Sequence, residues 1–172
     1  SFGIQIAKLY NCTVISTASQ DKLDKLKEIG ADYAVDHRKE DWGKEVYKIT
    51  KDISAKTGVS PGIDVSFDHI GQTHWNQQLT LLKYGGTLVS CGATTGYDAK
   101  TDLRHIFFKG TNILGSTQGT KAELDQGLYW MGKGKIKAII DSVYSFENAA
   151  EAHTKMLTGK GLFGKILMKP QA

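Results

Sequence analysis

The sequence predicts an α/β protein built on a doubly wound, mostly parallel sheet. Two observations favour this class: short β-branched segments alternate with amphipathic helical segments, and polar or glycine-containing turns follow the predicted strands. The composition agrees, since 172 residues with 40% hydrophobic and 23% charged side chains are typical of a soluble globular domain. Every apolar run is too short to cross a membrane. The net charge of +4 is dispersed along the chain, which argues against nucleic acid as a partner.

Side-chain periodicity places the elements of the first half of the chain. Phe2, Ile6 and Leu9 lie near helical spacing, so the sequence begins inside a helix. We therefore expect the natural protein to continue upstream, because a domain rarely starts there without a cap or a leading strand. The sequence then predicts strands over 13–17, 33–35 and 63–67, and helices over 21–29, 42–53 and 75–82. Gly30 ends the helix over 21–29, and Gly85 with Gly86 ends the helix over 75–82.

The second half of the chain continues the same alternation. The sequence predicts strands over 87–91, 112–116, 139–143 and 165–168, and helices over 103–108, 122–131 and 146–157. Strands separated by helices of this length indicate βαβ units and a parallel sheet. The sequence contains no internal repeat and no linker that would divide it.

Cysteine, histidine and serine residues predict neither a metal site nor a nucleophilic catalytic site in this chain. Cys12 and Cys91 lie far apart, which favours a reducing compartment and a cytoplasmic location. His69, His74 and Cys91 lack the paired spacing of zinc ligands. Ser90 and Ser116 have no base and orienting partner, as a hydrolase triad requires. His105 has two interpretations, a substrate contact and a partly buried histidine with a structural partner, of which we favour the second.

The carboxyl ends of the predicted strands carry the candidate binding residues, because ligands of doubly wound sheets bind there. These ends are Thr17-Ala18-Ser19, Asp36-His37-Arg38, His69-Ile70-Gly71, Cys91-Gly92-Ala93 and Ser116-Thr117-Gln118. Glycine at any one end indicates a plain turn as readily as the close approach of a ligand. All five ends together favour a ligand site.

The order of these segments resembles the C-terminal cofactor-binding domain of medium-chain dehydrogenases and reductases. That family includes zinc alcohol dehydrogenases, quinone oxidoreductases and enoyl-thioester reductases. The resemblance rests on Ile4–Lys8, Lys22–Asp32, Ile63–Gly71, Lys83–Thr95, Ile113–Thr120, Phe146–His153 and Phe163–Leu167. It implies a Rossmann-like sheet with strand order 3-2-1-4-5-6 that is incomplete at its N-terminus.

The resemblance also implies that parts of the active site lie outside this sequence. The family's first strand and glycine-rich phosphate loop would precede Ser1, and its catalytic domain, with any zinc, is likewise missing. Residues 1–172 would then be a nucleotide-cofactor-binding fragment without catalytic residues, inactive alone. The missing strand would be central, so its neighbours would have unpaired backbone unless residues upstream or another chain fill the gap.

The end of the second strand of such a sheet bears on the coenzyme. NAD-dependent relatives place Asp where this sequence has Thr17, so the resemblance favours NADP over NAD. Ser19 and the cations Lys22, His37 and Arg38 would approach the 2′-phosphate. Alternatively, Lys22 is a solvated helix residue and Arg38 a loop charge. Asp21, which complicates the site, is interpreted as a helix cap.

The resemblance assigns roles to the other strand ends. His69, Ile70 and Gly71 would flank the adenosine ribose and pyrophosphate. The backbone of the segments after the next two strands would hold the nicotinamide carboxamide: Cys91, Gly92 and Ala93, with Ser116, Thr117 and Gln118. Gly164 and Lys165 would provide a backbone contact or a cation near the phosphates, although we favour a surface charge for Lys165.

These inferences together predict the NADPH-binding part of an oxidoreductase. Its small-molecule substrate would be a carbonyl or a conjugated alkene, of the quinone, enal or enoyl-thioester type. The alternatives are a zinc-dependent alcohol dehydrogenase and a non-catalytic NADP-binding module. The strand over Asn112–Ser116 would lie at a sheet edge and pair with its copy in a homodimer, unless the helix over 122–131 or the missing domain covers it.

Overall fold

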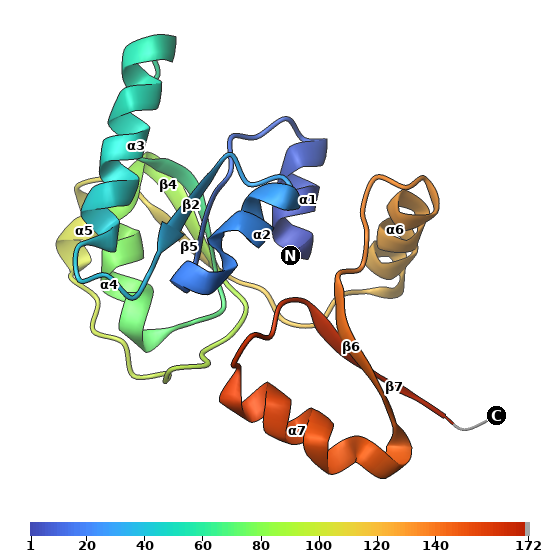
Figure 1. Ribbon diagram of the computed structural model, residues 1–172. Helices are drawn as coiled ribbons and strands as arrows, with labels where there is room; N and C mark the ends of the chain where they lie inside the picture. Colours follow the sequence, from blue (N-terminus) through green and yellow to red (C-terminus); the bar gives the residue numbers. More distant parts are fainter. Residues whose placement is uncertain (171–172) are drawn as a thin grey trace. The chain divides into compact units, whose positions relative to one another are not determined.

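The computed structural model describes residues 1–170 and confirms the α/β class, with parallel strands separated by helices (Figure 1). The chain forms two compact units. The terminal unit comprises residues 1–38 together with the described residues from Thr120 onward, and the central unit comprises residues 39–119. No helix within residues 1–170 has the length and apolar character needed to span a bilayer.

The terminal unit contains two pairs of parallel strands. Its elements are α1 (Phe2–Leu9), β1 (Ile15–Ala18), a 3₁₀ turn (Gln20–Lys22), α2 (Leu23–Glu28), β2 (Tyr33–Asp36), α6 (Lys121–Gly132), β6 (Ile140–Ser145), a second 3₁₀ turn (Phe146–Asn148), α7 (Ala149–Thr158) and β7 (Lys165–Lys169). β1 pairs with β2, and β6 pairs with β7. A small apolar core forms around Ile4, Leu26 and Ala31. In Figure 1, α7 lies along the β6–β7 pair.

The central unit is a three-stranded parallel sheet with helices. Its elements are α3 (Trp42–Thr57), β3 (Ile63–Asp68), α4 (Gln72–Leu81), β4 (Leu82–Ser90), α5 (Leu103–Phe107) and β5 (Asn112–Gly115). The strand order is β3-β4-β5, and the buried Leu79, Leu82 and Leu88 form the core. Among the described residues, β5 pairs only with β4, which confirms its predicted position at an edge.

Two predicted boundaries around α4 are wrong. The helix begins at Gln72, before the predicted Trp75, and it ends at Leu81 because β4 starts at Leu82. Gly85 and Gly86 therefore lie inside a strand. The β3–β4 register shifts between Ile63 and Val65, and the irregular strand accommodates the two glycines where a regular strand would disfavour them.

The strands next to the expected gap each have one hydrogen-bonded neighbour. Within residues 1–170, β1 pairs with β2 alone and β3 with β4 alone. One edge of each strand is therefore without a strand partner among the described residues.

Candidate functional site

The buried carboxylate of Asp68 organises the carboxyl end of β3. Asp68 is 1% exposed. Its oxygens accept hydrogen bonds from the amides of Ile70 (3.0 Å) and Gly71 (3.1 Å) and from Nε2 of Gln78 (2.8 Å). The hydroxyl of Ser66 donates to Oε1 of the same Gln78 at 2.6 Å. The carboxylate therefore satisfies backbone donors at the start of α4 and holds the turn over residues 69–71.

The turn after β3 is tied to the loop after β4. The hydroxyl of Thr94 donates to the carbonyl of His69 at 2.9 Å. Both the amide and the hydroxyl of Thr95 donate to the carbonyl of Ile70, each at 2.8 Å. Sequence reasoning missed Thr94, Thr95 and Asp68. The only signal was Asp68 itself, because aspartate just after an apolar strand commonly accepts hydrogen bonds from the next backbone amides.

Two of the predicted glycines allow these loops to approach each other. Gly71 has a φ of +85°, and a Cβ there would lie 2.7 Å from the carbonyl oxygen of Gly96. A Cβ on Gly92 would lie 3.2 Å from the carbonyl oxygen of His69. Both glycines therefore have a packing role that requires no ligand, a role that differs from the plain turn left open by the sequence.

The hydrogen-bond ladder continues one residue past the strand ends. The amide of Cys91 donates to the carbonyl of Asp68 (2.8 Å), and the amide of Ser116 donates to the carbonyl of Ser90 (2.9 Å). The thiol of Cys91 is free and exposed. The structure thus brings the central-unit candidates together at the carboxyl ends of the three parallel strands: His69, Ile70, Gly71, Cys91, Gly92, Ala93, Ser116, Thr117 and Gln118.

A second group of candidates follows β1 and β2 in the terminal unit. The amide of His37 donates to the carbonyl of Ala18 at 3.1 Å, so the two strand ends lie side by side. Thr17 is exposed and Ser19 is buried. The carboxylate of Asp36, also buried, accepts a hydrogen bond from the backbone amide of Arg38 at 2.9 Å.

The basic residues of this group differ in their contacts and exposure. The ammonium of Lys22 donates to the carbonyl of Gly159 at 3.3 Å, a contact that neither interpretation of Lys22 included. Burial lowers the pKa of His37, and the positive charges of Arg38 and Lys22 lower it further against the opposing effect of Asp36. The lowered pKa favours the neutral imidazole of His37. Arg38 is exposed.

The interpretation of Asp21 as a helix cap is wrong. Ser19 occupies the N-cap position of the first 3₁₀ turn, and Asp21 lies within that turn. A hydrogen bond from the hydroxyl of Ser19 lowers the pKa of Asp21, as do the nearby charges of Lys22 and Arg38. Asp21 therefore places a carboxylate among the groups predicted to meet a phosphate.

Gly164 and Lys165 stand at the beginning of β7. Gly164 has a φ of +110°, and a Cβ there would collide with the carbonyl of Ile139, so glycine is required by the backbone alone. The amide of Lys165 donates to that same carbonyl at 2.8 Å, and its side chain is exposed. These contacts give both residues a structural role.

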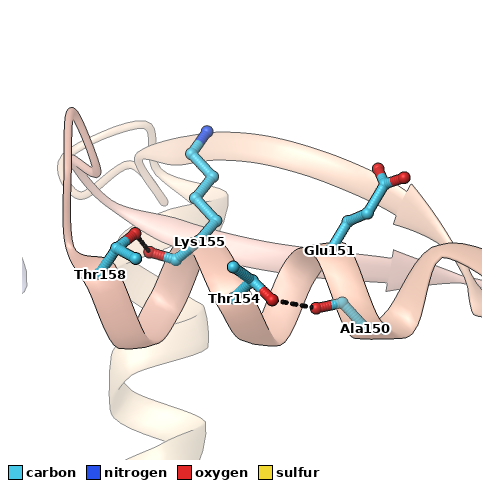
Figure 2. Close-up of a pocket in the computed structure, with 5 residues that line it drawn as sticks. All are labelled: Ala150, Glu151, Thr154, Lys155 and Thr158. Atoms are coloured by element: carbon cyan, nitrogen blue, oxygen red, sulfur yellow. Dashed lines mark hydrogen bonds between the residues drawn. The ribbon is translucent and has the colours of Figure 1, made fainter.

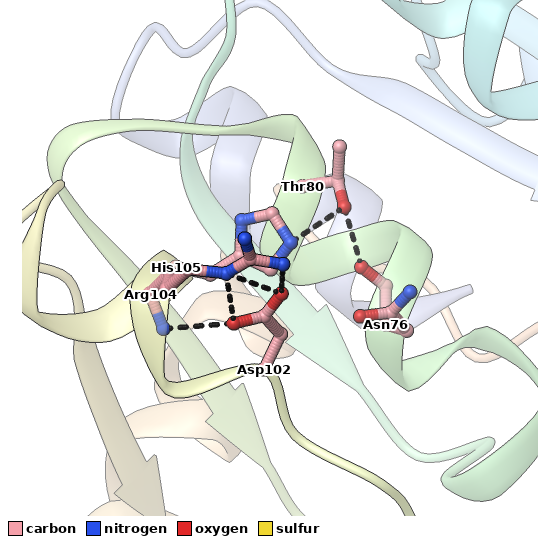
Figure 3. A network of polar contacts seen from close by, with 5 residues as sticks. All are labelled: Asn76, Thr80, Asp102, Arg104 and His105. Atoms are coloured by element: carbon pink, nitrogen blue, oxygen red, sulfur yellow. Dashed lines mark hydrogen bonds and ion pairs between the residues drawn. The ribbon is translucent and has the colours of Figure 1, made fainter.

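His105 has a structural partner. Figure 3 shows its Nε2 close to the hydroxyl of Thr80, at 3.4 Å. The neighbouring Asp102 caps α5 and pairs with the guanidinium of Arg104 at 2.7 Å, which lowers the pKa of Asp102 to about 2. These contacts tie α5 to α4 and support the structural interpretation of His105 that the sequence favoured.

A hollow on α7 is lined by none of the predicted site residues. It measures about 460 Å³ and is lined by Ala150, Glu151, Thr154, Lys155 and Thr158 (Figure 2). The hydroxyl of Thr154 donates to the carbonyl of Ala150, and Lys155 forms an ion pair with Asp141, so these polar groups already have partners. Within residues 1–170 there is no group of three or more His, Cys, Asp or Glu side chains placed to hold a metal ion.

Comparison with protein families gives one match that covers most of the chain. Residues 1–133 match the family of zinc-binding dehydrogenases. The remaining residues, from 134 onward, lie outside the matched region.

Individual relatives agree with this match. The chain is 30% identical to dehydrogenase FUB6 of Fusarium oxysporum f. sp. lycopersici over 96% of its length and 48% of that protein. It is also 30% identical to the quinone oxidoreductase of Mus musculus, over 95% of its length and 49% of that protein. Among solved structures, an NAD-dependent alcohol dehydrogenase superposes with a TM-score of 0.83 at 35% identity, covering 96% of this chain and 46% of that one. The chain thus spans about half the length of the relatives it matches.

Proposed function

This chain belongs to the zinc-binding dehydrogenase family, within the medium-chain dehydrogenases and reductases, and we propose that it is the NADPH-binding part of an oxidoreductase. The observation that carries the proposal is the arrangement of residues at the carboxyl ends of β3, β4 and β5. There, the loops after β3 and β4 are hydrogen-bonded to each other, and the amide of Ser116 after β5 donates to the carbonyl of Ser90. A flat, extended dinucleotide suits the carboxyl ends of such parallel strands.

The residues present fit a nicotinamide dinucleotide in chemical type. The turn over residues 69–71 would flank the ribose and pyrophosphate, and the backbone of residues 91–93 and 116–118 would hold the carboxamide. When bound, the cofactor supplies a hydride. The chain's own residues bind and orient it. We propose that residues 1–172 form a cofactor-binding unit that needs a separate catalytic part. We expect no turnover from these residues alone.

The preference for NADPH is supported by residue chemistry at the ends of β1 and β2. Thr17 carries no charge that would repel a 2′-phosphate, and Ser19 and Arg38 offer donors to it. Two findings weigh against this preference: Asp21 lies among these groups, and the structure at 35% identity is that of an NAD-dependent enzyme. The ratio of the dissociation constants for NADPH and NADH is therefore the quantity to measure.

The substrate class that we propose is a quinone, an enal or an enoyl-thioester, reduced at its carbonyl or conjugated alkene. The quinone oxidoreductase relative supports this choice. A zinc-dependent alcohol dehydrogenase is the second candidate, favoured by the alcohol dehydrogenase at 35% identity. A third candidate is a module that binds NADP without catalysis. Turnover of the full-length protein with each substrate class, before and after zinc removal by a chelator, separates the three.

We further propose a homodimer in which β5 pairs with its copy. Support comes from the edge position of β5 and from its exposed apolar residues, since Leu114 is 53% and Ile113 is 37% exposed. Substituting Ile113→Pro removes one backbone donor and should dissociate the dimer without unfolding it. Sedimentation of the full-length protein tests this, and a monomeric wild type at micromolar concentration contradicts it. A cytoplasmic location completes the proposal, supported by two exposed free cysteines.

The dissociation constants of NADPH and NADH for the full-length protein test the proposed function. Both ligands fluoresce, so an equilibrium titration gives each constant directly. We expect saturable binding of both and tighter binding of NADPH. Absence of saturable binding of either dinucleotide contradicts the proposed function, whereas tighter binding of NADH contradicts only the preference.

A further inference from the structure

We infer that Thr94 and Thr95 are positioning residues that hold the turn over residues 69–71 in the conformation that binds the dinucleotide. This inference rests on the proposed function. Neither threonine is among the candidates that the sequence or the family resemblance supplied. Both act on the turn through the carbonyl groups that it presents to the loop after β4.

Two hydroxyls and two amides clamp the turn from this side. Thr94 donates to the carbonyl of His69 through its hydroxyl at 2.9 Å and its amide at 3.4 Å. Thr95 donates to the carbonyl of Ile70 through its hydroxyl and its amide, each at 2.8 Å. A carbonyl that accepts two donors from one residue is held in direction as well as position.

The hydroxyl of Thr95 also organises the start of α4. It accepts hydrogen bonds from the amide of Thr73 at 3.2 Å and from the hydroxyl of Thr73 at 3.1 Å. In addition, the amide of Gln72 donates to the carbonyl of Gly96 at 3.1 Å. The loop after β4 therefore satisfies donors at the helix start and also donates to the carbonyls of the turn, so several hydrogen bonds link the two loops.

Asp68 holds the same turn through different groups, the amides of Ile70 and Gly71. The difference lies in burial: Asp68 is buried, whereas Thr94 and Thr95 are exposed. Loss of an exposed hydroxyl leaves its former partner accessible to water, so the fold survives while the turn gains freedom. The threonines are therefore the part of this arrangement that governs order and not stability.

The test uses Thr94→Val and Thr95→Val, separately and together, in the full-length protein. Valine keeps the branched shape of the threonine side chain and carries a methyl group in place of the hydroxyl. Thr154→Val is the matched control, because its exposed hydroxyl donates to the carbonyl of Ala150 at 2.8 Å on α7, in the terminal unit. Thr94→Ser keeps the hydroxyl that Thr94→Val removes, so its dissociation constant for NADPH should match that of the wild type.

Two readouts are measured. The first is amide hydrogen exchange of the segment 69–73 in ligand-free protein, which we expect to be faster in the double variant and unchanged in the control. The second is the dissociation constant of NADPH, which we expect to rise about threefold for each single variant and about tenfold for the pair, with an unchanged melting temperature in the ligand-free state.

Each outcome has a separate meaning. Faster exchange with an unchanged dissociation constant overturns the positioning role. Unchanged exchange overturns the inference at its first step, whatever the ligand does. If the wild type binds neither dinucleotide but the exchange rates change as expected, the proposed function fails and the role of the threonines in ordering the turn stands by itself.

Discussion

The two groups of strand ends are built in opposite ways. In the central unit, the edge beside β3 and β4 is defined by backbone groups that Asp68, Thr94 and Thr95 hold in place. In the terminal unit, the ends of β1 and β2 expose side chains of both charges, among them Asp21 and Arg38. The first arrangement favours a fixed ligand geometry, and the second favours discrimination by charge.

This difference predicts which property each mutation should change. Substitutions in the central unit should change stability or overall affinity, because they alter the order of a backbone surface. Substitutions in the terminal unit should change the ratio between NADPH and NADH, because the two ligands differ only in one phosphate. Four variants, taken from the largest expected effect to the smallest, test this division.

Asp68→Ala should have the largest effect. It leaves the amides of Ile70 and Gly71 without their buried acceptor, and we expect a loss of about 3–5 kcal/mol in the free energy of unfolding. Urea unfolding of the full-length protein measures it. Asp64→Ala, on the same strand, is the control: its side chain is 78% exposed, so its ion pair with Lys83 should contribute less than about 1 kcal/mol. Equal losses for the two variants would remove the special role of Asp68.

Thr17→Asp should have the next largest effect, on coenzyme choice. A carboxylate there accepts from ribose hydroxyls and repels a 2′-phosphate, so we expect the preference for NADPH over NADH to fall about tenfold or more. Titration with both dinucleotides measures the ratio. Thr13→Asp, an exposed position just before the same strand, should leave the ratio unchanged. An unchanged ratio in Thr17→Asp would show that the phosphate does not bind here.

Lys22→Ala should weaken NADPH by no more than about 1 kcal/mol, since its ammonium already donates to the carbonyl of Gly159. The dissociation constant of NADPH, compared with that of the exposed Lys27→Ala on α2, measures the effect. A loss tenfold or greater, specific to Lys22, would mean that the ammonium leaves Gly159 to meet the phosphate.

His37→Gln should have the smallest effect above pH 7. Burial lowers the pKa of His37 below its ordinary value of 6.5, which favours the neutral imidazole above pH 7. The substitution therefore removes no positive charge from the site at that pH. Below pH 6.5 the unfolded chain takes up the proton first, so the wild type should lose stability relative to His37→Gln as the pH falls. Unfolding and NADPH titrations at pH 8 and pH 5.5 check both statements. A large loss of NADPH affinity at pH 8 would contradict them.

The sequence predicted the fold and the charged strand ends better than it predicted the ordered turn. Periodicity located the helices and strands of the described chain to within a few residues, apart from the start of β4, because apolar residues recur at helical or strand spacing. It failed at Gly85 and Gly86, since a glycine pair ends a helix or sits in a strand irregularity with the same residue types. Lys22 and His37 were identified by charge, whereas their actual contacts depend on segments far away in the sequence.

Thr94 and Thr95 escaped notice for a related reason, whereas Asp68 gave the signal of an aspartate at the end of an apolar strand. The hydroxyls of the two threonines donate to backbone carbonyls of a neighbouring loop, and no residue pattern along one segment reveals a partner that is itself backbone. Such residues become visible only when the strand register places the two loops together.

The most direct test of the central claim is the footprint of NADPH on the full-length protein, measured by hydrogen–deuterium exchange with and without saturating ligand. We expect slower exchange in segments 17–22, 69–73 and 91–96, and unchanged exchange in 150–158, the segment that includes the residues lining the hollow on α7. Protection that is absent from both 69–73 and 91–96 while NADPH is bound would contradict the claim that the dinucleotide binds at these strand ends.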